Sequence, residues 1–113
     1  KGVIVANTYK VLAQSNPSAA TLTDAYTVPA ATSTVVSTIS VCNRSAVATS
    51  FRISIQVANA ADDNKQYLYY DTIIAGNDTF VAQLGISLAT TDVIAVYATL
   101  ATLSFNVFGV EIT

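Results

Sequence analysis

The sequence predicts an all-β fold: a single antiparallel β-sandwich of about eight strands with a jelly-roll-like arrangement. Residues that favour strands crowd into short runs, which Gly, Pro, Asn, Asp and Ala-rich turns separate. Apolar and polar residues alternate within several runs, and no stretch carries a helical period long enough to predict a helix. The runs recur at roughly 8–15 residues, a spacing typical of sandwiches and barrels, and two Greek keys use eight strands.

Three strands are expected in the first half of the chain. Residues 9–15 form the first, which ends before Pro17 because proline cannot donate to a strand ladder. Residues 22–28 form the second, and residues 29–32 link it to the third. Residues 33–43 alternate between two faces of a strand and lead into a tight connection.

The clearest strand is expected at residues 49–57, where apolar residues at odd positions alternate with polar residues at even ones. A polar loop follows at residues 59–64. A further strand is predicted at 66–74, and the turn after it contains Gly76 and Asn77, which tolerate positive φ.

Three more strands complete the set, at residues 79–87, 92–99 and 103–112. The last one is apolar on both faces, with Phe105 on one side and Phe108 on the other. Such a strand is either central in its sheet or covered by a neighbouring subunit.

The first eight residues are expected to be an N-terminal arm, and residues 9–113 the sandwich domain. Val3, Ile4 and Val5 form a β-prone segment, which is expected to dock on a neighbour by adding a strand to an open sheet edge. The apolar part is too short for a signal peptide. Whether an initiator Met precedes Lys1 stays open.

The chain is unusually poor in charge. Lys and Arg total 5, Asp and Glu total 7, and charged residues are 11% of the 113, against a usual share of about 25%. A monomer of 11.8 kDa exposes roughly 5,900 Å², which so few charges cannot dominate. Such a surface is weakly protected against self-association. A homo-oligomer is therefore expected, with a trimer favoured.

Charge and hydropathy also bound the partners. The net charge is −2 and the five cations are scattered, whereas tracking of phosphates needs a basic cluster. No apolar run approaches the ~20 residues of a membrane span. Neither a nucleic acid nor a membrane is expected as a partner.

No residues suggest an active site, and the chain is expected not to be an enzyme. Histidine is absent, and Cys42 is the single cysteine, so it forms no intramolecular disulfide and is interpreted as a small buried hydrophobe. Asp62, Asp63 and Asn64 are the one acidic cluster. They could offer oxygen ligands to Ca²⁺, but an ordinary solvated turn is favoured, and no metal or cofactor is expected.

Three of the six tyrosines lie close together, at Tyr67, Tyr69 and Tyr70. Strand geometry puts the first two on one face and Tyr70 on the other. A sugar-binding platform is one interpretation, but packing on the sandwich or a subunit contact is favoured. Together with the arm and the last strand, the candidate interface residues are Val3, Ile4, Val5, Tyr67, Tyr69, Phe105 and Phe108.

Several segments resemble small β-sandwich structural proteins of tailed bacteriophages, over roughly residues 20–113. The segments that carry this resemblance are residues 26–30, 41–45, 51–53, 69–71, 96–98 and 105–109. The resemblance implies a non-enzymatic virion structural protein on the phage particle, in contact with the major capsid protein or other virion proteins. A capsid decoration (cement) protein that stabilises the head shell is the favoured function. The alternatives are a tail, baseplate or fibre module, and a carbohydrate-binding adsorption module.

Overall fold

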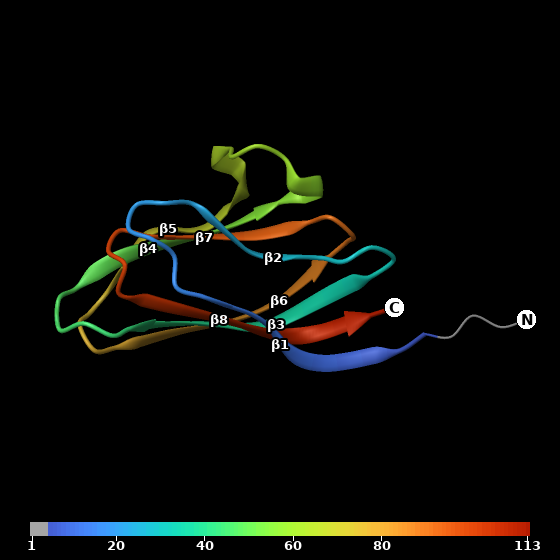
Figure 1. The fold of residues 1–113 in the computed structure, drawn as a ribbon, viewed down its shortest axis with the longest axis horizontal. Coiled ribbons are helices and arrows are strands. Elements are labelled where there is room, and N and C mark those ends of the chain that lie inside the picture. The colour runs from blue at the N-terminus through green and yellow to red at the C-terminus, as the bar shows by residue number, and fades with distance from the viewer. Residues whose placement is uncertain (1–4) are drawn as a thin grey trace, which may run out of the picture.

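The computed structural model describes residues 5–113, which form two four-stranded antiparallel sheets packed face to face (Figure 1). The first sheet has the strand order β1-β8-β3-β6 and the second the order β2-β7-β4-β5. This is the order of an eight-stranded jelly roll, so the predicted fold class is confirmed. The strands are β1 (Asn7–Ser15), β2 (Thr23–Thr27), β3 (Ser33–Asn43), β4 (Thr49–Gln56), β5 (Tyr67–Ile74), β6 (Thr79–Leu88), β7 (Val93–Ala98) and β8 (Leu103–Ile112).

The strand bounds agree closely with those expected from the turns. The largest difference is at the start, where β1 includes Asn7 and Thr8, which pair with Ile112 and Glu111 of β8. These two residues therefore belong to the sandwich and not to the expected arm. The polar loop between β4 and β5 carries two single-turn 3₁₀ helices, η1 (Val57–Asn59) and η2 (Asn64–Gln66), which lie on the outer side of the second sheet (Figure 1).

The core lies between the sheets and is built from the inward positions of both. Phe51 of β4 is its aromatic centre, with ring centroids 5.2 Å from Phe80 and 6.2 Å from Phe105. Edge and tilted ring pairs of this kind stabilise a core beyond the area they bury. The other large, fully buried side chains are Ile39, Ile53, Ile94, Leu103, Val28, Val36, Val41, Val93, Val96 and Val107.

The strand that is apolar on both faces, β8, is central in its sheet, which is one of the two positions expected for it. It lies between β1 and β3, and its inward residues alternate with half-buried outward ones. Gly109 sits where β3 approaches closely, since a Cβ there would collide with the carbonyl oxygen of Val35. The sheet can pack at this point only because position 109 has no side chain.

Candidate interaction surfaces

The outer side of the first sheet carries no charged side chain among the described residues. Its four strands contain two charged residues, Lys10 and Glu111. Both turn to the other side, where the Lys10 ammonium lies 3.2 Å from the Glu111 carboxylate. Residues paired across neighbouring strands share a face, so the pairing of the sheet defines which residues lie together on this outer side.

Three rows of paired residues form the centre of this surface. In the middle row Val11, Phe108, Thr38 and Gln83 lie side by side across β1, β8, β3 and β6. The rows beside it follow the same strand order. We call the whole surface the uncharged face: Tyr9, Val11, Gln14, Val35, Thr38, Ser40, Cys42, Thr79, Val81, Gln83, Ser87, Ser104, Asn106, Phe108 and Val110.

The uncharged face mixes aliphatic and aromatic groups with hydroxyls and amides. Tyr9 is 79% exposed, and Val11 and Val81 are about half exposed. The amide of Gln14 donates to the side-chain oxygen of Asn106 across β1 and β8, at 2.8 Å. Exposed sheets of soluble proteins usually carry charges that discourage association, so a four-stranded face without any charge is a candidate contact surface.

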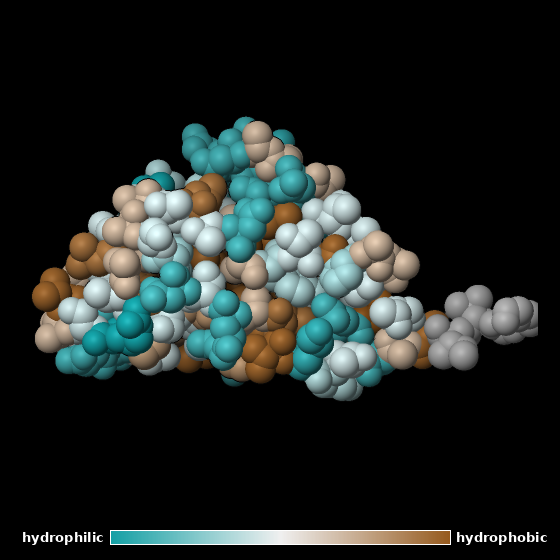
Figure 2. Space-filling view, in the orientation of Figure 1, coloured by the Kyte–Doolittle hydropathy of each residue, from teal (hydrophilic) through white to brown (hydrophobic). Residues whose placement is uncertain are grey.

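A second candidate surface, with exposed aliphatic residues, lies at one end of the sandwich, opposite both chain termini (Figure 1). Val47, Ile73 and Leu100 are exposed there, at 60%, 79% and 39%, and they come from three separate segments of the chain. Figure 2 shows hydrophobic residues at this left-hand end, with hydrophilic residues below them. Because loop ends of soluble domains are usually polar, these three residues, which we call the apolar tip, are a second candidate contact.

Asn43 holds the turns of this end together from inside. Its side chain is buried, and its amide group donates to the carbonyl oxygens of Val47 at 2.9 Å and Ala75 at 3.2 Å. Its amide oxygen accepts from the Ser45 N–H and from the Thr102 hydroxyl. One buried amide therefore joins three turns, and the apolar tip is held in a defined shape.

Two charged residues of the second sheet, Arg52 and Asp71, pair with each other on its outer side. The Arg52 guanidinium donates two hydrogen bonds to the Asp71 carboxylate, at 2.6 and 3.3 Å. It also stacks on the rings of Tyr70 and Tyr97, 4.1 and 4.3 Å from their centroids. The hydrogen bonds to Asp71 raise the pKa of Arg52. This arrangement keeps the cation engaged with the protein itself.

Beside this stack an open hollow of about 470 Å³ is lined by Asn64, Tyr67 and Tyr70. The two tyrosine rings are perpendicular, with centroids 5.0 Å apart. The Tyr67 hydroxyl donates to the Asp62 carboxylate at 2.8 Å, and burial together with this carboxylate raises the pKa of Tyr67. We call this feature the tyrosine hollow.

The tyrosines do not divide between the faces as strand alternation predicts. Between its pairings with Phe51 and Ser54, β5 contains two more residues than β4, so two bulges interrupt its alternation. Asp71 accordingly has a positive φ of 52°. As a result Tyr67 lies beside Tyr70 on the outside, and Tyr69 packs inward against Phe51 and Phe80.

The other predicted interface residues fall in different places. Val3 and Ile4 lie outside the described residues, and Val5 is 65% exposed. Phe108 is half-buried on the uncharged face. Phe105 is 1% exposed and its ring packs edge-on against Phe51. The prediction that Phe105 is an interface residue is therefore wrong, because its side chain fills the core between the sheets.

Cys42 also differs from its expected place. It is half-buried and belongs to the uncharged face, because Val41 and Asn43 on either side of it point inward. An apolar run in the sequence cannot show which of two adjacent residues faces the core. The sequence did not single out the uncharged face as a whole, because its members come from four strands that are distant in the chain.

Two acidic residues of the loops, Asp92 and Asp63, are engaged in local structure. Asp92 is buried and accepts the backbone N–H groups of Ala58 at 2.8 Å and Ala89 at 2.9 Å. Asp63 caps η2 and forms a capping box with Gln66. Within residues 5–113, no three His, Cys, Asp or Glu side chains are grouped in a way that could hold a metal ion.

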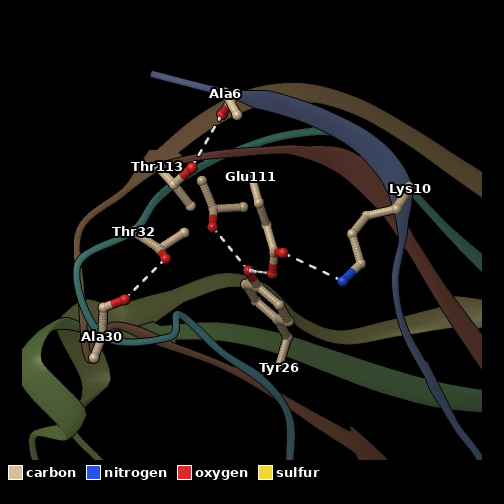
Figure 3. Close-up of polar contacts among 8 residues, drawn as sticks. Ala6, Lys10, Tyr26, Ala30, Thr32, Glu111 and Thr113 are labelled. Carbon is tan, nitrogen blue, oxygen red and sulfur yellow. Dashed lines mark hydrogen bonds and ion pairs between the residues drawn. The ribbon is translucent and has the colours of Figure 1, made fainter. Parts of the chain in front are cut away.

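At the end of the sandwich near the termini, Tyr26 of β2 reaches across to β8 (Figure 3). Its hydroxyl donates to the Glu111 carboxylate at 2.7 Å and lies 2.8 Å from the Thr34 hydroxyl. Burial, with the nearby Glu111 carboxylate, raises the pKa of Tyr26 to about 12. The hydrogen bond from Tyr26, assisted by Lys10, lowers the pKa of Glu111. This network ties the two sheets together.

Comparison of the chain with protein-family profiles, characterised proteins and solved structures finds no match. In the described part of the chain, no helix has the length and apolar character needed to cross a membrane. The fold and its surfaces therefore carry the functional argument.

Proposed function

We propose that this chain is a non-enzymatic structural protein of a bacteriophage virion, and specifically a capsid decoration protein that stabilises the head shell. The observation that carries this proposal is the absence of charge over an entire sheet face, the uncharged face. Such a surface is suited to contact with other subunits, since interface cores are depleted of charge and enriched in aromatic residues. The resemblance of several strands to phage structural sandwiches supports the choice of assembly.

The apolar tip suits attachment to the shell. Its three exposed aliphatic residues make a small footprint, too small for strong binding by a single copy. In a shell the same contact repeats many times, and many weak contacts can together resist expansion of the particle. Asn43 keeps the supporting turns in place, which lowers the ordering cost of binding.

The proposal is tested on particles that lack the protein. Added protein is expected to bind these particles and raise the temperature at which they release their genome. Leu100→Asp should weaken binding at least tenfold, because a charge would be desolvated in the contact. Val57→Asp is the matched control: Val57 is an equally apolar, 65% exposed residue, but it lies in η1, outside the apolar tip.

Particles that are equally heat-stable with and without the protein would contradict the decoration function. Labelled protein found only on the tail would replace it with the tail-module alternative. Equal loss of binding in both variants would show that the apolar tip is not the contact.

The tyrosine hollow favours one second candidate, a carbohydrate-binding adsorption module. The rings of Tyr67 and Tyr70 that line the hollow can pack against the C–H groups of a sugar ring, while Asn64 offers a donor and an acceptor to its hydroxyls. The test is a titration with neutral mono- and oligosaccharides followed by tyrosine fluorescence. Saturable binding that Tyr70→Ala abolishes would support this candidate, and no binding at millimolar sugar would eliminate it.

A further inference from the structure

We propose that the uncharged face binds a second copy of this chain around a two-fold axis, so that two sandwiches pack back to back through their first sheets. This inference rests on the proposed function in taking the uncharged face as an assembly contact, and it goes further by naming the partner. Three properties of the face point to a second copy.

The first property is charge. A face that meets a different protein is commonly matched to it by opposite charges, which steer and select the partner. A face that meets itself must avoid like charges, because each charge would lie near its own copy. None of the residues that form the uncharged face is charged. The charged residues of the second sheet and its loop, such as Arg52, Asp62 and Asp71, would lie on the outer sides of the pair, far from one another.

The second property is the chemistry of the polar groups. Thr38, Ser40 and Gln83 carry hydroxyl or amide groups that both donate and accept hydrogen bonds. Identical copies of such groups can pair with one another, whereas two ammonium or two carboxylate groups cannot. Phe108 and Val110 supply apolar area beside them on β8. The face is therefore self-complementary in the way an isologous contact requires.

The third property is size. Four strands about 4.8 Å apart make a face about 19 Å wide, and ten residues at about 3.3 Å each make it about 33 Å long. The product is about 600 Å² in projection, and the pleated side-chain surface is larger than its projection. Stable interfaces bury about 800 Å² on each partner, so one sheet face is large enough.

The geometry favours a dimer over the trimer that the sequence analysis favoured. A face that pairs with itself closes a dimer and leaves no second copy of the contact open. A trimer would instead require two different patches on each chain. In the dimer the apolar tips stay outside the contact, so they can still bind another partner.

The experiment uses the full-length protein in solution and two variants of opposite charge. Thr38 lies on β3 in the middle row, next to Phe108, and therefore close to any two-fold axis through the centre of the face. Sedimentation equilibrium at increasing concentration should give a mass near twice that of the chain for the native protein. Thr38→Glu and Thr38→Lys should each raise the dimer dissociation constant at least a hundredfold. An equimolar mixture of the two should recover most of the dimer.

Thr21→Glu and Thr21→Lys provide the matched control, because Thr21 is an exposed threonine in the β1–β2 connection, next to Ala20, whose N–H bonds to Ala98 of the second sheet. They should leave the dimer unchanged. Far-UV circular dichroism and urea unfolding of each Thr38 variant show whether a loss of dimer reflects a loss of fold. The equimolar mixture of the two Thr38 variants also distinguishes loss of the contact from loss of the fold, since mixing cannot refold unfolded chains.

A monomer at about 100 μM, a trimer mass, or a dimer that tolerates both Thr38 variants would overturn the inference. These outcomes are distinct from failure of the proposed function. A chain that stays monomeric in solution but stabilises phage heads would refute only the inference. A dimer that fails to bind any phage particle would refute only the decoration function.

Discussion

The hydroxyl of Tyr26 in the second sheet donates a 2.7 Å hydrogen bond to the carboxylate of Glu111 in the first, and this bond joins the two layers near the chain termini (Figure 3). The contribution of this hydrogen bond to stability can be measured from the pH dependence of the free energy of unfolding. The pKa of Tyr26 rises from 10.0 to about 12 on folding, so the unfolded chain loses this proton first. The free energy of unfolding should therefore fall between about pH 10 and 12, by roughly 2–3 kcal/mol.

Tyr26→Phe is expected to remove this part of the alkaline loss, measured by urea unfolding at a series of pH values. Tyr70→Phe is the control, because it also removes one phenol but leaves the Tyr26 network intact. At acid pH the lowered pKa of Glu111 acts in the opposite sense: its stabilisation is complete above its usual pKa of 4.5 and is lost as pH falls below it. The Tyr26 variant should weaken that acid limb. Identical profiles for both variants would contradict the role of the network.

Asp92 should be the acid whose replacement costs most. Its two carboxylate oxygens accept the N–H groups of Ala58 and Ala89, so Asp92→Ala leaves two donors of the neighbouring loops without their acceptor. The expected loss is about 2–6 kcal/mol in the free energy of unfolding, at about 1–3 kcal/mol for each of the two unsatisfied groups. Asp92→Asn keeps one acceptor oxygen and should lose about half as much. Thermal or urea unfolding measures both, and an Asn variant as unstable as the Ala variant would be inconsistent with this explanation.

Asn43→Asp should disturb the apolar tip without changing the shape of the side chain. The carboxylate cannot donate to the carbonyl oxygens of Val47 and Ala75, and a buried charge would face them. A loss of about 2–4 kcal/mol is expected, and hydrogen exchange should accelerate in the turns around residues 44–48 and 75–78. Asn59→Asp, the same change at an exposed loop position, should have little effect. Unchanged exchange in those turns would show that Asn43 does not hold them.

Replacing Asp62 and Asp63 together by Asn should leave folding and assembly nearly unchanged. Asn caps a helical turn about as well as Asp does, so the N–H of Lys65 keeps its acceptor. The Tyr67 hydroxyl likewise keeps an oxygen acceptor at position 62. The expected change is within about 0.5–1 kcal/mol. If Ca²⁺ raised the melting temperature of the native chain but not of this variant, a cation site at the acidic loop would replace the interpretation as a turn.

The sequence by itself determined the strands and the fold class of this protein. Strand bounds are local properties: Pro17, Pro29 and the turn at Gly76 and Asn77 interrupt the backbone wherever the chain folds. Alternation in β4 likewise identified Phe51 and Ile53 as inward residues, because side chains of a regular strand must point to opposite sides.

Only the tertiary structure decided which residues form surfaces. The two extra residues in β5 place Tyr67 beside Tyr70 and direct Tyr69 inward. The sequence of β5 could not show this, because a bulge depends on the partner strand and interrupts the alternation of side chains. The uncharged face unites residues from β1, β8, β3 and β6, whose order is set by long-range pairing. It lacks charge because the strand register places Lys10 beside Gly109 and Glu111 beside Thr34, at positions on the opposite side of the sheet.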